Sequence, residues 1–180
     1  LLVDVSGSMA PYSRALLRFA HALGRSGPGV EVFAIGTRLT RLTTALSPRD
    51  PDAALAAAAD AVEDWSGGTR LGDTLGVLLD DWAPRGIGRG ATVVVLSDGW
   101  DRGDPGELAT HMDRLHRLAH RVVWVNPLIV TPGYAPLARG MAAALPHVDD
   151  FVAGHSLAAL EELAALIADD RRPSTREVVR

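Results

Sequence analysis

The sequence predicts an α/β fold: a Rossmann-like, doubly wound, mostly parallel sheet with helices on both faces and one antiparallel edge strand. Short apolar runs alternate along the chain with longer segments whose apolar residues recur at helical spacing, the order typical of a parallel sheet covered by helices. The run 91–96 is rich in β-branched residues, as expected for a strand buried on both faces.

The elements are expected in the following order. Strands are expected at 1–5, 30–35, 91–96, 122–125 and 151–152, with a half-polar edge strand around Leu39 and Leu42. Helices are expected at 12–25, 53–62, 73–82, 107–119, 136–145 and 156–168. We therefore predict one domain over residues 1–170, whose first strand is truncated at its N-terminus, and a polar, loose tail over 171–180.

Composition excludes several classes of function. The 180-residue chain has no cysteine, which rules out disulfides, thiol nucleophiles and zinc-thiolate sites. It also has no lysine, which rules out a P-loop and Schiff-base chemistry. The net charge of −4 provides no basic field for nucleic acid or anionic membranes. No apolar run approaches the ~20 residues of a membrane-spanning helix, and the expected location is cytoplasmic.

Three polar loops carry the candidate functional residues. The first strand ends in Asp4-Val5-Ser6-Gly7-Ser8, Thr69 lies in the loop 66–70, and Asp98 follows the buried strand 91–96. In doubly wound sheets, ligands bind outside the carboxyl ends of the strands, where these loops can meet. Carboxylate and hydroxyl oxygens suit a hard cation such as Mg²⁺.

Each of these motifs has a plainer interpretation. Serine and aspartate before a helix usually cap it, so Asp4-x-Ser6-x-Ser8 alone is compatible with capping. Gly154-His155-Ser156 is similar to a nucleophile elbow, but no histidine follows it, so Ser156 is interpreted as a helix cap. His116 and His120 have metal-ligand spacing, yet nothing nearby in the sequence completes a catalytic set; we expect ordinary helix-surface roles.

Taken together, the three loops resemble a von Willebrand factor type A (VWA) domain with a metal-ion-dependent adhesion site (MIDAS). The five positions are Asp4, Ser6, Ser8, Thr69 and Asp98. The resemblance implies that the hydroxyls bind Mg²⁺ or Mn²⁺ directly, that the carboxylates bind directly or through water, and that a partner's carboxylate takes the open position. It implies a binding domain rather than an enzyme.

A narrower resemblance lies further along the chain. Asn126-Pro127-Leu128, Pro132-Gly133-Tyr134, Arg139-Gly140-Met141 and Gly154-His155-Ser156 are similar to the CoxE-like branch. That branch comprises accessory proteins of carbon monoxide dehydrogenase and other molybdenum hydroxylases. The resemblance implies a role in metalloenzyme maturation with a MoxR-type AAA+ ATPase, or with the molybdenum hydroxylase client itself, as partner. Members usually carry a long segment before the VWA domain, so this chain is expected to be a piece of a longer protein.

Three further residues are candidates for partner contact. Trp100 follows Asp98 in a loop beside the expected metal, where an exposed aromatic side chain could anchor a partner. Asp101 and Arg70 flank the same loops. Two other functions stay open at this point: a metal-dependent hydrolase, which would lack a histidine base in the three loops, and an extracellular adhesion module.

Overall fold

The computed structural model describes residues 1–180 except 28, 64, 66, 132–134, 137 and 170–180, so the predicted tail lies outside the described residues. Six strands form one sheet in the order β3-β2-β1-β4-β5-β6. The strands are β1 Leu2–Asp4, β2 Phe33–Ile35, β3 Leu39–Arg41, β4 Thr92–Leu96, β5 Arg121–Asn126 and β6 Asp150–Ala153. Among the strands of the described residues, only β2 and β3 pair antiparallel, at one edge, which confirms the predicted fold class.

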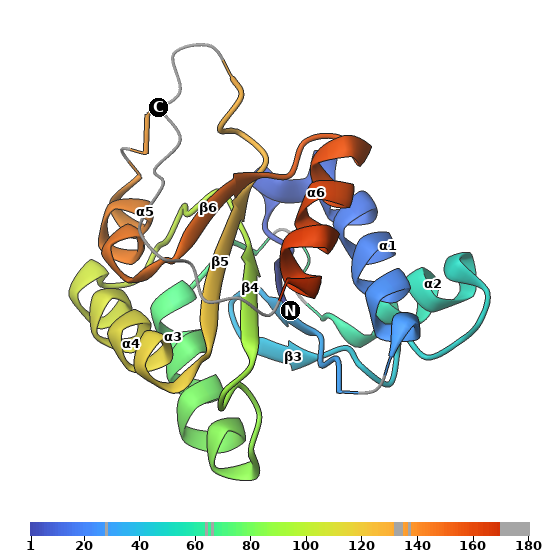
Figure 1. Cartoon of the computed structure of the whole chain (residues 1–180), viewed down its shortest axis with the longest axis horizontal. Coiled ribbons are helices and arrows are strands. Elements are labelled where there is room, and N and C mark those ends of the chain that lie inside the picture. Colours follow the sequence, from blue (N-terminus) through green and yellow to red (C-terminus); the bar gives the residue numbers. More distant parts are fainter. Residues whose placement is uncertain (28, 64, 66, 132–134, 137, 170–180) are drawn as a thin grey trace.

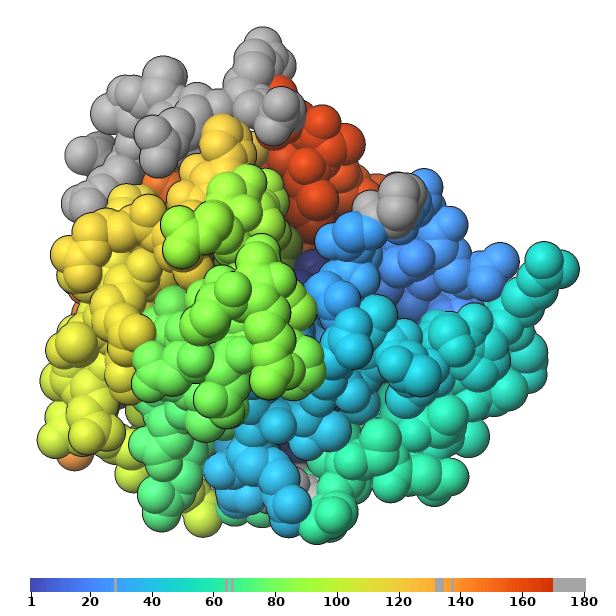
Figure 2. Space-filling view, turned by 90° about the horizontal axis from the view of Figure 1, so that it is seen from below, coloured from blue at the N-terminus to red at the C-terminus, as the bar shows by residue number. Residues whose placement is uncertain are grey.

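Helices cover both faces of this sheet. They are α1 Ala10–Ser26, α2 Pro51–Ala61, α3 Leu71–Val77, α4 Pro105–Leu118, α5 Arg139–Ala144 and α6 Leu157–Ala168. Short turns of helix lie between them: η1 Gly7–Met9, η2 Leu78–Trp82, η3 Ala83–Arg85 and η4 Leu145–His147. Figure 1 shows α1, α2 and α6 on one face and α3, α4 and α5 on the other. Figure 2 shows the molecule from below Figure 1. The green segment in this view contains η2 and η3.

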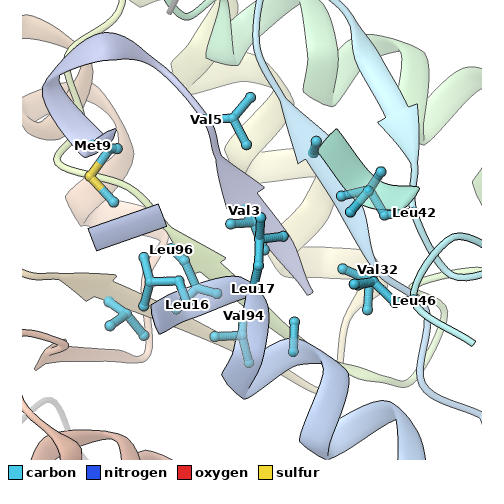
Figure 3. Close-up of a cluster of buried hydrophobic side chains, with 14 of the residues drawn as sticks. Val3, Val5, Met9, Leu16, Leu17, Val32, Leu42, Leu46, Val94 and Leu96 are labelled. Atoms are coloured by element: carbon cyan, nitrogen blue, oxygen red, sulfur yellow. The ribbon is translucent and has the colours of Figure 1, made fainter. Parts of the chain in front are cut away.

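The two faces of the sheet have separate apolar cores because successive side chains of a strand point to opposite faces. Val3, Val94 and Leu96 pack with α1, α2 and α6 in the core drawn in Figure 3. Leu2 and Trp124 belong to the other core, with residues of α3, α4 and α5. The sheet is therefore held from both sides, and its strand ends are rigid supports for the loops that follow them.

The structure differs from the predicted elements at several boundaries. The predicted strand 30–35 is shortened to β2, and just before β2 the amide of Val32 donates to the Thr43 side-chain hydroxyl at 3.0 Å. The predicted helix 73–82 starts earlier, at Leu71, and its last turn is the π-helical η2. The predicted helix 136–145 begins only at Arg139. Among the described residues, no helix is long and apolar enough to cross a membrane.

Replacing Leu96 with alanine tests the central position of β4. Leu96 is fully buried, so Leu96→Ala should lower the free energy of unfolding by about 2–5 kcal/mol. Leu157 is 73% exposed on α6, so Leu157→Ala, the same chemical change, should stay within about 0.5 kcal/mol of the parent protein. Urea denaturation of the three proteins measures both effects. Equal losses would contradict the packing described above.

Candidate metal centre

The sheet topology brings two of the three polar loops together. β1 and β4 are neighbours in the sheet although 87 residues (5–91) separate Asp4, the last residue of β1, from Thr92, the first residue of β4. Asp4 ends β1, and Asp98 lies two residues beyond the end of β4. In this strand order, β1 and β4 flank the point where the winding of the sheet reverses, which is where ligands bind in such folds.

Asp4 is the residue to which all three loops attach. Its Oδ1 accepts hydrogen bonds from the Ser6 amide at 2.9 Å and the Thr69 hydroxyl at 3.0 Å. Its Oδ2 accepts a hydrogen bond from the Ser97 hydroxyl at 2.6 Å. Burial raises the pKa of Asp4, hydrogen bonds from Ser97 and Ser6 partly offset this, and the negative charge of Asp98 adds to the rise. A cation at this position would favour the ionised carboxylate.

Ser6 and Ser8 lie where the chain passes from β1 into η1 and then α1. Neither η1 nor α1 has a side-chain hydrogen bond capping its N-terminus. Instead, the two hydroxyl oxygens lie 3.2 Å apart and share a hydrogen bond. The capping interpretation of these serines is therefore wrong, and both hydroxyls lie beside the Asp4 loop, Ser6 buried and Ser8 exposed.

Thr69 comes from the loop before α3 and binds the same Asp4 oxygen as the Ser6 amide. Its side chain is buried, with only 2% exposed, and its hydroxyl points to Asp4. The loop is held in place because the Arg70 amide donates to the carbonyl of Gly36, at the end of β2, at 3.1 Å. Gly68 has a φ of +97°, a left-handed conformation that a side chain would strain.

Asp98 provides the second carboxylate. Its Oδ1 accepts from the Trp100 amide at 3.0 Å, and the Asn126 side chain donates to its carbonyl at 3.3 Å. Its Oδ2 is buried and has no hydrogen-bond partner among the residues that the structure describes. A buried carboxylate oxygen without a partner is costly and requires an explanation, and a bound cation would provide one.

The set of oxygens fits a hard cation. It combines two carboxylates, Asp4 and Asp98, with three neutral hydroxyls, which is ligand chemistry suited to Mg²⁺ or Mn²⁺. Within the described part of the chain, no group of three or more His, Cys, Asp or Glu side chains could hold a metal. The hydroxyls of Ser6, Ser8 and Thr69 are therefore needed for any cation site in these loops.

Sequence reasoning missed Ser97, which belongs to the same hydrogen-bond network. Its hydroxyl donates to Asp4 and accepts from the Gly99 amide at 3.0 Å, so it joins the first loop to the third. Ser97 is completely buried. Its position between a buried strand and Asp98 was the available signal, because a polar residue that directly continues an apolar strand must find a partner inside the protein.

The three predicted partner-contact residues differ in exposure. Trp100 is 68% exposed, which is unusual for a tryptophan, and it is two residues from Asp98. Arg70 is exposed and pairs with Asp73 at 3.1 Å. Asp101 is only partly exposed, and its carboxylate accepts hydrogen bonds from backbone amides of two loops. Trp100 and Arg70 thus face outward beside Asp98 and Thr69, whereas Asp101 is used within the protein.

One plainer interpretation from the sequence is confirmed, and a second is confirmed for one of its two residues. The Ser156 hydroxyl accepts from the Ala159 amide at 3.2 Å and caps α6. His116 lies on α4 with 43% of its side chain exposed and approaches Asp149 at 3.6 Å, as expected for a residue on a helix surface. His120, in contrast, lies beyond the end of α4 at Leu118 and is half-buried, so the helix-surface role expected for it is wrong.

Three of the solved structures with similar folds are a VWA protein, a protein with a MIDAS motif and a VWA domain. Von Willebrand factor type A from Catenulispora acidiphila superposes with a TM-score of 0.63 at 16% identity, covering 94% of this chain and 41% of that one. Proximal thread matrix protein 1 from the mussel byssus, with a zinc-occupied MIDAS motif, gives 0.56 at 16% identity, covering 94% and 43%. The SpRpn10 VWA domain gives 0.53 at 16% identity, covering 97% and 96%. The chain thus spans about two fifths of the first two structures.

A comparison with curated protein sequences finds no significant match. At 16% identity, the solved structures establish the fold and nothing further. The family follows instead from the family model described as "VWA domain containing CoxE-like protein", which matches residues 1–160 and therefore includes all five candidate ligands. This chain belongs to the family of CoxE-like proteins that contain a VWA domain.

Proposed function

We propose that this domain binds Mg²⁺ or Mn²⁺ at Asp4, Ser6, Ser8, Thr69 and Asp98 and uses the bound cation to recognise an acidic side chain of a partner protein. The observation that supports this most strongly is Asp98 Oδ2, which, like Asp101 Oδ2, is a buried carboxylate oxygen without a hydrogen-bond partner in the described part of the chain. It belongs to the residue whose negative charge acts on the buried Asp4. The zinc-occupied MIDAS motif of the mussel protein supports a divalent ion in this fold.

The neutral and the charged residues would have different roles in binding the cation. The hydroxyls of Ser6, Ser8 and Thr69 are neutral, so they would bind the cation without cancelling its charge. Asp4 and Asp98, bound directly or through water, would supply the negative charge that holds the cation. An octahedral ion with this set keeps a replaceable water, and a carboxylate from a partner could displace it once the interface excludes solvent.

The acidic partner that we propose is a MoxR-type AAA+ ATPase or a molybdenum hydroxylase client, in a maturation role. Membership of the CoxE-like family supports this choice. The net charge of −4 would repel an acidic partner without the cation, so binding would depend on the metal. Trp100 and Arg70 would contact the partner around the metal. Recognition fits better than hydrolysis because the loops that carry Ser6, Thr69 and Asp98 contain no histidine base.

Removing one proposed hydroxyl ligand should weaken metal binding without harming the fold. Ser8→Ala should reduce the affinity for Mn²⁺ at least tenfold. Loss of a residue that only hydrogen-bonds to a metal ligand typically lowers metal affinity about 10–100-fold, and loss of a direct ligand should have at least the smaller of these effects. Ser156→Ala is the matched control: it removes a helix cap and should cost about 1 kcal/mol of stability, with unchanged Mn²⁺ affinity. Titration calorimetry measures both. Equal affinity in the Ser8 and Ser156 variants would contradict the ligand assignment.

Partner binding should depend on both the cation and Trp100. In a pull-down with the purified MoxR-type ATPase or the client, a chelator should release the partner and Mg²⁺ should restore it. Trp100→Ala should weaken the complex by about 2 kcal/mol, the size expected for an exposed aromatic anchor. Val77→Ala, at an apolar residue of α3 that is 42% exposed, serves as control and should have little effect. A complex that survives chelation would show that the metal is not the docking point.

A further inference from the structure

We propose that Asp101 is a positioning residue of the metal site: it ties the loop after β4 to the loop that carries Thr69, without contacting the metal. This inference rests on the proposed cation site and assigns to one residue the task of holding two of its loops together. Three contacts between these loops carry it, and all of them involve Asp101 or its neighbour Arg102.

The first contact is made by the Asp101 side chain. Its Oδ1 accepts from the Leu71 amide at 2.9 Å and from the Gly103 amide at 3.1 Å. Leu71 is the first residue of α3 and lies two residues after Thr69. One carboxylate oxygen thus holds the start of α3 and the turn of its own loop together.

The other two contacts are made by Arg102 with Thr69 and with the preceding residue, Gly68. The Arg102 amide donates to the Thr69 carbonyl at 3.0 Å. The Arg102 side chain lies against Gly68, where a Cβ would come within 2.7 Å of its Nε. Gly68, Thr69 and Leu71 each contact Asp101 or Arg102, so Thr69 cannot move relative to Asp98 without disturbing these contacts.

The position of Asp101 is restricted by close packing against Gly140 of α5. A Cβ on Gly140 would come within 2.8 Å of the Asp101 Cβ and 2.5 Å of the Gly99 carbonyl oxygen. Only glycine permits this approach, which explains why the Arg139-Gly140-Met141 motif has glycine at its centre. Because Asp101 is packed against the scaffold, its hydrogen bonds can transmit that rigidity to the Thr69 loop.

A role as a metal ligand does not suit Asp101. No group of three or more His, Cys, Asp or Glu side chains that could hold a metal exists in the described part of the chain, so Asp101 does not form such a group with Asp4 and Asp98. Its Oδ1 already accepts two backbone amides, and its Oδ2 is buried without a hydrogen-bond partner in the described part of the chain. The contacts of Oδ1 therefore place the carboxylate to act on the metal site through the Thr69 loop.

The test compares two substitutions at this position. Asp101→Asn keeps an oxygen that can accept both amides, whereas Asp101→Ala removes it. We expect the alanine variant to bind Mn²⁺ at least tenfold more weakly than the asparagine variant, because only alanine releases the Thr69 loop. In a Thr69→Val background this difference should shrink to about twofold or less, because the Thr69 loop then carries no hydroxyl that can bind the metal. Equal Mn²⁺ affinity in the two single variants, or an unchanged difference in the Thr69→Val background, would overturn the proposal.

Asp104→Ala is the control on the same loop. Asp104 also accepts a backbone amide, that of Gly106 at 2.6 Å, but it caps α4 and does not join the loops. It should lower thermal stability and leave Mn²⁺ affinity within about twofold. A loss of affinity like that of Asp101→Ala would mean that any damage to this loop is enough, and would also overturn the proposal.

A measurement without metal separates this inference from the proposed function. Amide hydrogen exchange at Leu71 should accelerate in Asp101→Ala and stay close to the parent rate in Asp101→Asn. If the parent protein binds no Mn²⁺ but these exchange rates differ as expected, the cation site is wrong and the tie is right. If the parent binds Mn²⁺ and Leu71 exchanges at the same rate in both variants, the tie is wrong and the cation site stands.

Discussion

The structure of the site depends on the buried carboxylate of Asp4. Burying a charged group without partners is expensive, so the three loops must supply donors to it at once. They do so through the Ser6 amide, the Thr69 hydroxyl and the Ser97 hydroxyl, each within 3.0 Å. Because the donors come from three separate parts of the chain, one side chain determines where all three loops meet. Asp98 adds a second buried carboxylate beside it, and this accumulation of negative charge is what a cation would offset.

The scaffold supports this arrangement because the loops follow directly from strands that are packed rigidly in the sheet. β1 and β4 lie side by side with apolar cores on both faces, and Asp4 and Asp98 leave the sheet from its carboxyl end. Close approaches then bring the loops together: Gly99, with a φ of +79°, and Gly140 allow α5 to pack against the loop after β4. Rigid strands and glycine contacts thus set distances that the hydroxyls alone could not maintain.

Much of this arrangement could be predicted from the sequence. The alternation of apolar runs with helical segments predicts the sheet and its edge strand, and polar residues at strand ends predict where Asp4 and Asp98 lie. The contacts that hold the loops could not be predicted in the same way, because they join distant residues. Ser97 meets Asp4 across 93 positions, and Asp101 meets Leu71 across 30. The latter contact also explains why α3 begins at Leu71, which local preference for helix does not reveal.

We propose that oxygens from three loops surround one cation. A crystal structure with Mn²⁺, with data collected for anomalous scattering, tests it most directly. We expect a single strong anomalous peak among Ser6, Ser8 and Thr69, with metal–oxygen distances near the ~2.1 Å typical of Mg²⁺ sites. We also expect Asp98 Oδ2 bound to the ion or to one of its waters. No peak at this place, or a peak bound elsewhere while Asp98 Oδ2 keeps no partner, would contradict the account.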